Sequence, residues 1–81
     1  MGTLRIMSRR GDDRVQWDTT RVLDGEMDAV AAVREAERIF EQQRAKGATA
    51  FKVTKGEAAV RIDKFDPEAE QIMIVPRVVG G

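Results

Sequence analysis

The sequence of 81 residues contains no cysteine and no histidine. Without these two residue types the chain has no disulfide, no thiol nucleophile, no imidazole base and none of the usual zinc ligand sets. No apolar run approaches the roughly 18 residues of a membrane span, and the first residues lack the apolar stretch of a signal peptide. We therefore expect a cytoplasmic protein with no membrane partner and no catalytic residues of its own.

Neither sign of charge dominates, because 14 lysines and arginines face 14 aspartates and glutamates. With no basic excess, no overall field favours nucleic acid as a partner. A chain of this length forms one small domain with a single core and has no room for a deep catalytic cleft. The composition therefore predicts local protein binding, no enzyme activity, and no bound metal or cofactor.

Alternation of apolar and polar residues predicts two β-hairpins. The alternating apolar residues are Leu4 and Ile6, Val15 and Trp17, Phe51 and Val53, and Val60 and Ile62. A Gly-Asp turn within residues 8–13 separates the first two pairs, and Lys55-Gly56-Glu57 separates the last two. We expect Trp17, the only tryptophan, to pack in the core rather than to stack on a ligand.

Between the hairpins, residues 25–46 have the period of an amphipathic helix. Its apolar stripe follows spacings of four, three and four, through Ala29, Val33, Ala36 and Phe40. Asp24 or Asp28 is a candidate N-cap, and Gly47 stands where a left-handed stop belongs. Charged residues predict a solvated outer face with ion pairs three residues apart. These residues are Arg34, Glu37, Arg38, Glu41 and Arg44.

The last third of the sequence predicts a short turn and a final strand. Asp66-Pro67-Glu68 has the order of a helix cap and first turn, with Phe65 before it as a lid on the core. The apolar run of residues 72–75 predicts a strand that is buried on both faces and lies inside the sheet. Pro76 cannot donate to a β-ladder, so pairing is expected to end there. The domain is thus predicted over residues 1–75 and a tail over residues 76–81.

The tail ends in Gly80-Gly81, and these glycines predict a function for it. Glycine has no Cβ, so a Gly-Gly carboxylate can enter a narrow channel of an adenylating or hydrolysing enzyme. The alternative is a frayed, exposed chain end.

The element order, with a last strand that leads into Gly80-Gly81, resembles the β-grasp fold of ubiquitin and of the sulfur-carrier proteins. That resemblance implies an α+β fold, a ββαβ(β)β mixed sheet with one main helix packed across it. The segment 72–81 is similar to the end of the molybdopterin synthase small subunit, and also to bacterial ubiquitin-like modifiers. Arg77 stands where that subunit typically has a second proline, and it makes the tail more like the basic tail of ubiquitin.

The resemblance implies that a partner adenylating enzyme uses ATP to activate the carboxylate of Gly81, with Gly80 as a spacer. Pro76, Arg77, Val78 and Val79 would then dock in the partner as an added extended segment. As a protein modifier, the chain would pass to target proteins, with a conjugating enzyme and a deconjugating protease as further partners. The alternatives are a sulfur carrier with a C-terminal thiocarboxylate, and a non-covalent binding module whose glycines are incidental.

Other charged residues have a functional and a simpler interpretation. In ubiquitin-like folds the exposed sheet face docks partners, which implies a role for Arg5, Lys52 and Arg61. The other candidates are Arg9 and Arg10 for phosphate, Lys46, Lys52, Lys55 and Lys64 as acceptors of further copies, and Asp63, Asp66, Glu68 and Glu70 for a cation. We expect instead that the two arginines lie in a solvent-exposed turn and that the lysines are ordinary surface residues. The acids are expected to cap the turn or to be solvated.

Overall fold

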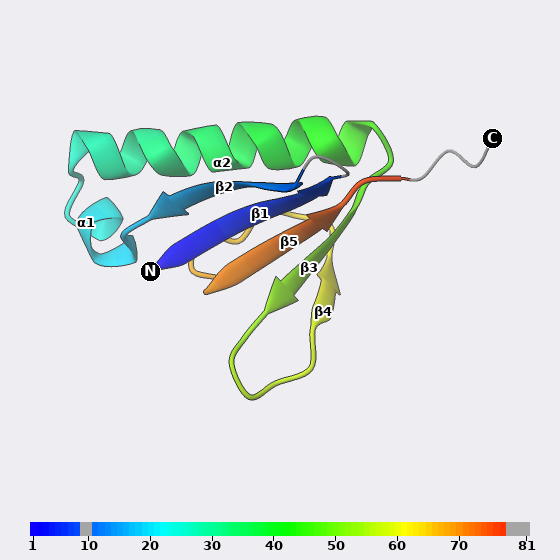
Figure 1. Ribbon diagram of the computed structural model, residues 1–81. Coiled ribbons are helices and arrows are strands. Elements are labelled where there is room, and N and C mark those ends of the chain that lie inside the picture. The colour runs from blue at the N-terminus through cyan, green and yellow to red at the C-terminus, as the bar shows by residue number, and fades with distance from the viewer. Residues whose placement is uncertain (9–10, 78–81) are drawn as a thin grey trace.

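The computed structural model describes residues 1–8 and 11–77, which form one mixed sheet and two helices (Figure 1). The elements are β1 (Gly2–Ser8), β2 (Gly11–Trp17), α1 (Thr19–Leu23), α2 (Met27–Ala45), β3 (Thr49–Val53), β4 (Val60–Ile62) and β5 (Gln71–Val75). The long helix α2 lies across one face of the sheet. The predicted α+β class, with five strands and one main helix, is therefore confirmed.

The last strand lies at the centre of the sheet, whose order is β2-β1-β5-β3-β4. β1 pairs antiparallel with β2, and β3 pairs antiparallel with β4, so both predicted hairpins are confirmed. The Gly-Asp turn expected for the first hairpin is wrong, because residues 11–13 belong to β2 and pair with residues 6–8 of β1. β5 joins the two hairpins, because it runs parallel to β1 on one side and antiparallel to β3 on the other. The predicted position of the final strand inside the sheet is correct.

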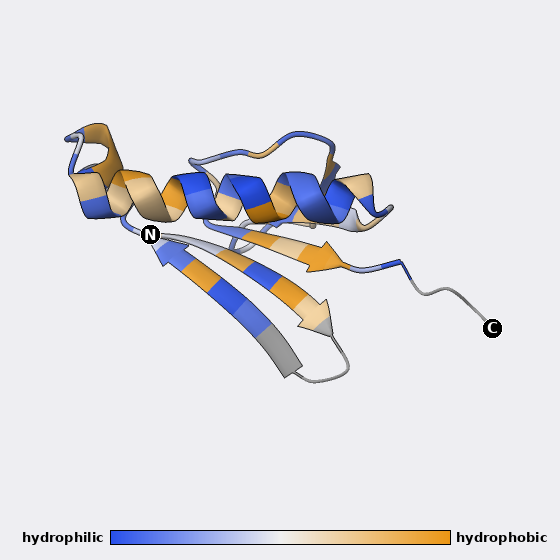
Figure 2. Ribbon diagram, turned by 90° about the horizontal axis from the view of Figure 1, so that it is seen from above, coloured by the Kyte–Doolittle hydropathy of each residue, from blue (hydrophilic) through white to orange (hydrophobic). Residues whose placement is uncertain are grey.

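The core fills the space between α2 and the sheet. Leu4, Phe40, Ile72 and Ile74 are its largest fully buried side chains. Figure 2, seen from above, shows α2 crossing the sheet with hydrophobic and hydrophilic segments alternating along it. This alternation follows from the helical period, which turns only one side of α2 toward the sheet.

Phe65 closes the core as expected from the sequence. Its ring centroid lies 5.6 Å from that of Trp17 and 5.8 Å from that of Phe40. Trp17 is also buried, and its indole Nε1 donates a 2.9 Å hydrogen bond to the carbonyl oxygen of Pro67. The only polar atom of the indole side chain is thus satisfied within the core, which is the packing role predicted for it.

The expectation that β5 is buried on both faces is wrong. Ile72 and Ile74 are fully buried under α2, but Met73 between them is half-buried and Val75 is 40% exposed. The physical reason is that α2 covers one face of the sheet, and no second layer of described residues covers the other. The apolar outward residues of β5 therefore lie on an open face.

The predicted N-caps of the main helix are also wrong. Glu26 occupies the N-cap position of α2 without a side-chain cap bond, while Asp24 ends the short helix α1. Asp28 lies in the first turn of α2 and pairs with Arg21 at 2.7 Å.

Helix α1 was not predicted from the sequence. Its N-cap is Asp18, whose carboxylate accepts from the backbone amides of Thr20 and Arg21 at 3.0 and 3.3 Å.

The predicted stop of α2 at Gly47 is confirmed. Gly47 has φ of +90°, and its amide donates to the Arg44 carbonyl at 2.9 Å, while that of Ala48 donates to the Gln43 carbonyl at 3.0 Å. These two bonds are those of a Schellman motif, which satisfies the last carbonyls of the helix. The chain therefore turns sharply at Gly47 and enters β3 two residues later.

Two smaller predictions need correction. Residues 66–68 form a single turn rather than a helical turn, in which Asp66 caps the amide of Glu68 at 2.9 Å. On α2, Arg38 pairs with Glu35 rather than with the expected Glu41.

Neither helix of the described chain combines the length and the apolar character of a membrane span.

Candidate functional site

The central strand leads directly to the predicted tail. β5 ends at Val75, which is paired with Thr49 at the start of β3. Pro76 follows, and since it has no amide hydrogen the ladder ends there. In Figure 1 the red segment after β5 leaves the sheet near the corner where α2 passes into β3.

The first residues of the tail lie against the end of the main helix. A Cβ atom built on Gly47 would lie 3.2 Å from Cδ and 3.8 Å from Nη1 of Arg77. The side chain of Arg77 therefore lies over the bare backbone of Gly47. Pro76 is half-buried and Arg77 is exposed, so the structure holds the base of the tail on the domain and leaves a cation at its surface.

Most of the predicted activation site lies outside the described residues. This holds for Val78, Val79, Gly80 and Gly81, and also for Arg9 and Arg10 in the first hairpin. Of the predicted tail, the structure places Pro76 and Arg77. The roles assigned to the terminal glycines stay predictions.

The open face of the sheet carries a row of paired residues that crosses the strands. Arg14 is opposite Arg5, Arg5 is opposite Met73, Met73 is opposite Phe51, and Phe51 is opposite Arg61. Residues in direct register project to the same face of a sheet. These five residues, which we call the sheet row, therefore lie side by side, with arginines at both ends and apolar side chains between them.

The residues around the sheet row are mostly apolar or uncharged. The outward positions of β1, β3, β4 and β5 are Thr3, Arg5, Met7, Thr49, Phe51, Val53, Arg61, Gln71, Met73 and Val75. The outward position of β2 opposite Met7 is an acid, Asp12, so an acidic residue lies at the β2 edge of this face. The part of the face on β3, β4 and β5 is apolar with one cation, Arg61, and suits a partner surface with apolar and acidic groups.

One residue predicted for this face lies on the other. Lys52 is paired in register with Ile72, so it shares the face of the core, and its Nζ lies 3.3 Å from Oδ2 of Asp66. The small inward residue of β3 is Ala50, which is fully buried, whereas the larger Phe51 faces outward. The outward positions predicted for Arg5 and Arg61 are correct.

Several acids of the second hairpin and the following turn have structural partners. Asp63 accepts from Arg44 at 3.1 Å, and Asp66 both caps Glu68 and pairs with Lys52. The carboxylate of Glu70 accepts from the backbone amide of Lys55 at 3.1 Å. No group of three metal-ligating side chains is found in the part of the chain that the structure describes.

The described candidate site consists of the sheet row and the base of the tail. No family model, curated protein or solved structure matches this chain.

Proposed function

We propose that this chain is a β-grasp protein modifier of the ubiquitin-like kind, activated at Gly81 by an ATP-dependent adenylating enzyme and transferred to target proteins. The observation that carries the proposal is the position of β5. It lies at the centre of a mixed sheet, parallel to β1 and between two hairpins, and it leads through Pro76 to Gly80-Gly81. The long helix α2 across one face of the sheet also supports a β-grasp fold.

The chemistry proposed for Gly81 needs an activating partner, because a carboxylate is a poor electrophile with a poor leaving group. An oxygen of the Gly81 carboxylate attacks the α-phosphorus of ATP, and pyrophosphate leaves. A thiol or amine then attacks the acyl adenylate, and AMP leaves as a thioester or amide bond forms. The absence of a Cβ on Gly80 and Gly81 lets this segment pass a narrow channel that a larger side chain would block.

The rest of the domain presents the tail to that partner. Arg77 lies on Gly47, which sets where the tail departs from the end of α2. The sheet row offers an apolar surface, Met73 and Phe51, bordered by Arg5 and Arg61. We assign this surface to the docking of the adenylating enzyme, whose contact surface should then carry apolar and acidic groups.

The proposal is tested by expressing an N-terminally tagged chain in its own cells and comparing it with a variant that lacks Gly80 and Gly81. The tagged chain should form adducts of higher mass that resist denaturation, and the deletion should abolish them without changing the melting temperature. A Glu57→Gln variant, which changes an exposed residue outside the tail and the sheet row, serves as a control that keeps both glycines and should still form the adducts. Adducts that persist after the deletion would refute the proposal, as would a mature protein found by mass spectrometry to continue beyond Gly81.

A sulfur carrier is the second candidate, and Pro76 directly after the central strand favours it. In that case sulfide, rather than an amine, receives the acyl group from the adenylate. Intact mass spectrometry after incubation with ATP, an adenylating enzyme and sulfide should show replacement of one oxygen by sulfur. The third alternative is a non-covalent binding module. It predicts that adding a residue after Gly81, which blocks the Gly81 carboxylate, leaves the activity of the protein unchanged.

A further inference from the structure

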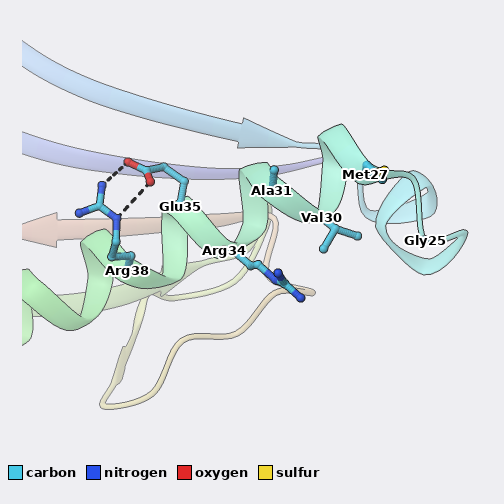
Figure 3. Close-up of a pocket in the computed structure, with 7 residues that line it drawn as sticks. All are labelled: Gly25, Met27, Val30, Ala31, Arg34, Glu35 and Arg38. Carbon is cyan, nitrogen blue, oxygen red and sulfur yellow. Dashed lines mark hydrogen bonds and ion pairs between the residues drawn. The ribbon is translucent and has the colours of Figure 1, made fainter.

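A groove runs along the outer side of α2, on the side of the helix away from the core. Its volume is about 530 Å³, and its lining is formed by Gly25, Met27, Val30, Ala31, Arg34, Glu35 and Arg38 (Figure 3). All of these residues come from α2 and the turn before it. The groove is therefore separate from the sheet row and from the base of the tail.

The end of the groove near the α1–α2 turn exposes apolar side chains to water. Met27 is 88% exposed, and Leu23, at the end of α1, is 77% exposed. Single exposed apolar residues are common, but here two large ones lie four residues apart, next to the half-buried Val30 and the small Ala31. Methionine is flexible and polarizable, and such side chains suit binding surfaces that adapt to a partner.

At the charged end of the groove, one arginine side chain has no ion-pair partner among the described residues. The guanidinium of Arg38 is bound by the Glu35 carboxylate. At the other end, Arg21 holds both Glu26 and Asp28, at 3.0 and 2.7 Å. Arg34 has no ion-pair partner in the described chain, and Figure 3 shows it projecting from the same side of α2 as Val30. The groove thus presents apolar surface beside one uncompensated positive charge.

The spacing of the lining residues fits a second helix. Met27, Ala31, Arg34 and Arg38 follow each other at intervals of four, three and four, and so lie in one stripe about 16 Å long. Ala31 and Gly25 are small, and a Cβ on Gly25 would meet nothing within 4 Å, so a neighbouring helix can approach closely. The backbone hydrogen bonds here are used within α2, so a strand has no edge to join. Packing of ridges into grooves is the remaining mode.

The apolar end of the groove is remote from the base of the tail. Arg77 lies at Gly47, at the opposite end of α2. From Ala45 back to Val30 the helix rises about 22 Å. Met27 at this end is 88% exposed, so no described residue of the chain covers it.

We propose that this groove binds an amphipathic helix of a partner protein, with its apolar side chains on Met27, Val30 and Ala31 and an aspartate or glutamate on Arg34. This inference does not depend on activation of Gly81, because it concerns a surface on the other side of the domain. It gives the protein a second binding surface, so that one partner can be held while the sheet row and tail engage another.

The test uses two synthetic helical peptides of about 15 residues that share a leucine stripe with the same four-three-four spacing. They differ only in the residues that flank the stripe, which are glutamates in one peptide and lysines in the other. Titration into the isotopically labelled full chain should shift the backbone amide signals of residues 25–38. The glutamate peptide should bind about threefold to tenfold more tightly than the lysine peptide.

Exchange of charge on the protein provides the decisive control. Arg34→Glu should reverse the preference, so that the lysine peptide binds more tightly. Lys64→Glu makes the same change of charge at an exposed residue outside the groove and should leave the preference as in the parent chain. Equal binding of both peptides, shifts confined to the sheet row, or an equal effect of the two variants would overturn the inference. The inference would also be overturned if, without peptide, the signals of residues 25–38 shifted with protein concentration. Such shifts would mean that a second copy of this chain occupies the groove.

Discussion

At the scale of single residues, Gly2 shows how closely the first hairpin is packed. It is opposite Trp17 in the β1–β2 register, and a Cβ on Gly2 would lie 2.1 Å from Cε2 and 2.3 Å from Nε1 of the indole. The indole cannot move away freely, because its Nε1 is bonded to the Pro67 carbonyl. No side chain larger than hydrogen fits at this position without a shift of the core.

We therefore predict that Gly2→Ala lowers the free energy of unfolding by roughly 1–3 kcal/mol, the usual cost of overpacking. Thermal denaturation followed by circular dichroism measures this as a fall in melting temperature of about 4–8 °C per kcal/mol. Trp17→Phe removes the atoms that would clash. The double variant should then lose less stability than the sum of the two single variants, and strict additivity would contradict the contact.

Two surface carboxylates make stability depend on pH. The hydrogen bond from Arg21 holds the pKa of Asp28 below its ordinary value of 3.8, and that from Arg38 holds the pKa of Glu35 below 4.5. Because each pKa is lower in the folded chain, each pair stabilises the fold above the unfolded-state pKa. This stabilisation is lost as the pH falls through the folded-state pKa. Both pairs are exposed, so the effect on stability is small and weakens with salt.

Carboxyl-carbon NMR titration measures these pKa values directly. In the Arg21→Gln variant the pKa of Asp28 should rise toward its ordinary value, while that of Glu35 stays low because its partner is Arg38. An unchanged pKa of Asp28 in this variant would show that Arg21 is not its partner in solution.

At the scale of elements, the strongest local signals predicted the structure well. The apolar spacing of Ala29, Ala36 and Phe40 predicted α2, because one stripe of the helix is buried, and Gly47 predicted its end, because the chain needs a left-handed residue there. Helix α1 was missed because it has only five residues and two of them are threonines, which have low helix propensity. Its one readable signal is Asp18, an N-cap residue before Thr19.

The faces of the strands were harder to predict than the strands themselves. In β3 the larger apolar residues, Phe51 and Val53, face outward, while the small Ala50 is fully buried in the core. Only one face of the sheet is covered by α2, and the apolar pattern of a strand alone does not reveal which face that is. The sheet row could be predicted only in part, since Arg5 and Arg61 carry a charge signal but Met73 and Phe51 become neighbours only through the register.

At the scale of the whole molecule, one helix on one face gives a small core. Its four largest fully buried side chains are Phe40, Leu4, Ile72 and Ile74, and alanines occupy much of the rest. A domain of this size is only marginally stable, so each large core residue contributes a substantial part of the total. The opposite face contributes less, because its apolar residues stay partly in contact with water.

The two phenylalanines on opposite faces test this asymmetry by the same chemical change. We predict that Phe40→Ala lowers the free energy of unfolding by about 3–5 kcal/mol, because it leaves a cavity under α2. Phe51→Ala should cost about 1 kcal/mol, because the half-buried ring loses less transfer energy and leaves no enclosed cavity. Urea denaturation of both variants, with equal slopes, measures the difference. Equal losses would contradict the open face, whereas a mild loss at Phe51 means that this residue is free to serve binding rather than folding.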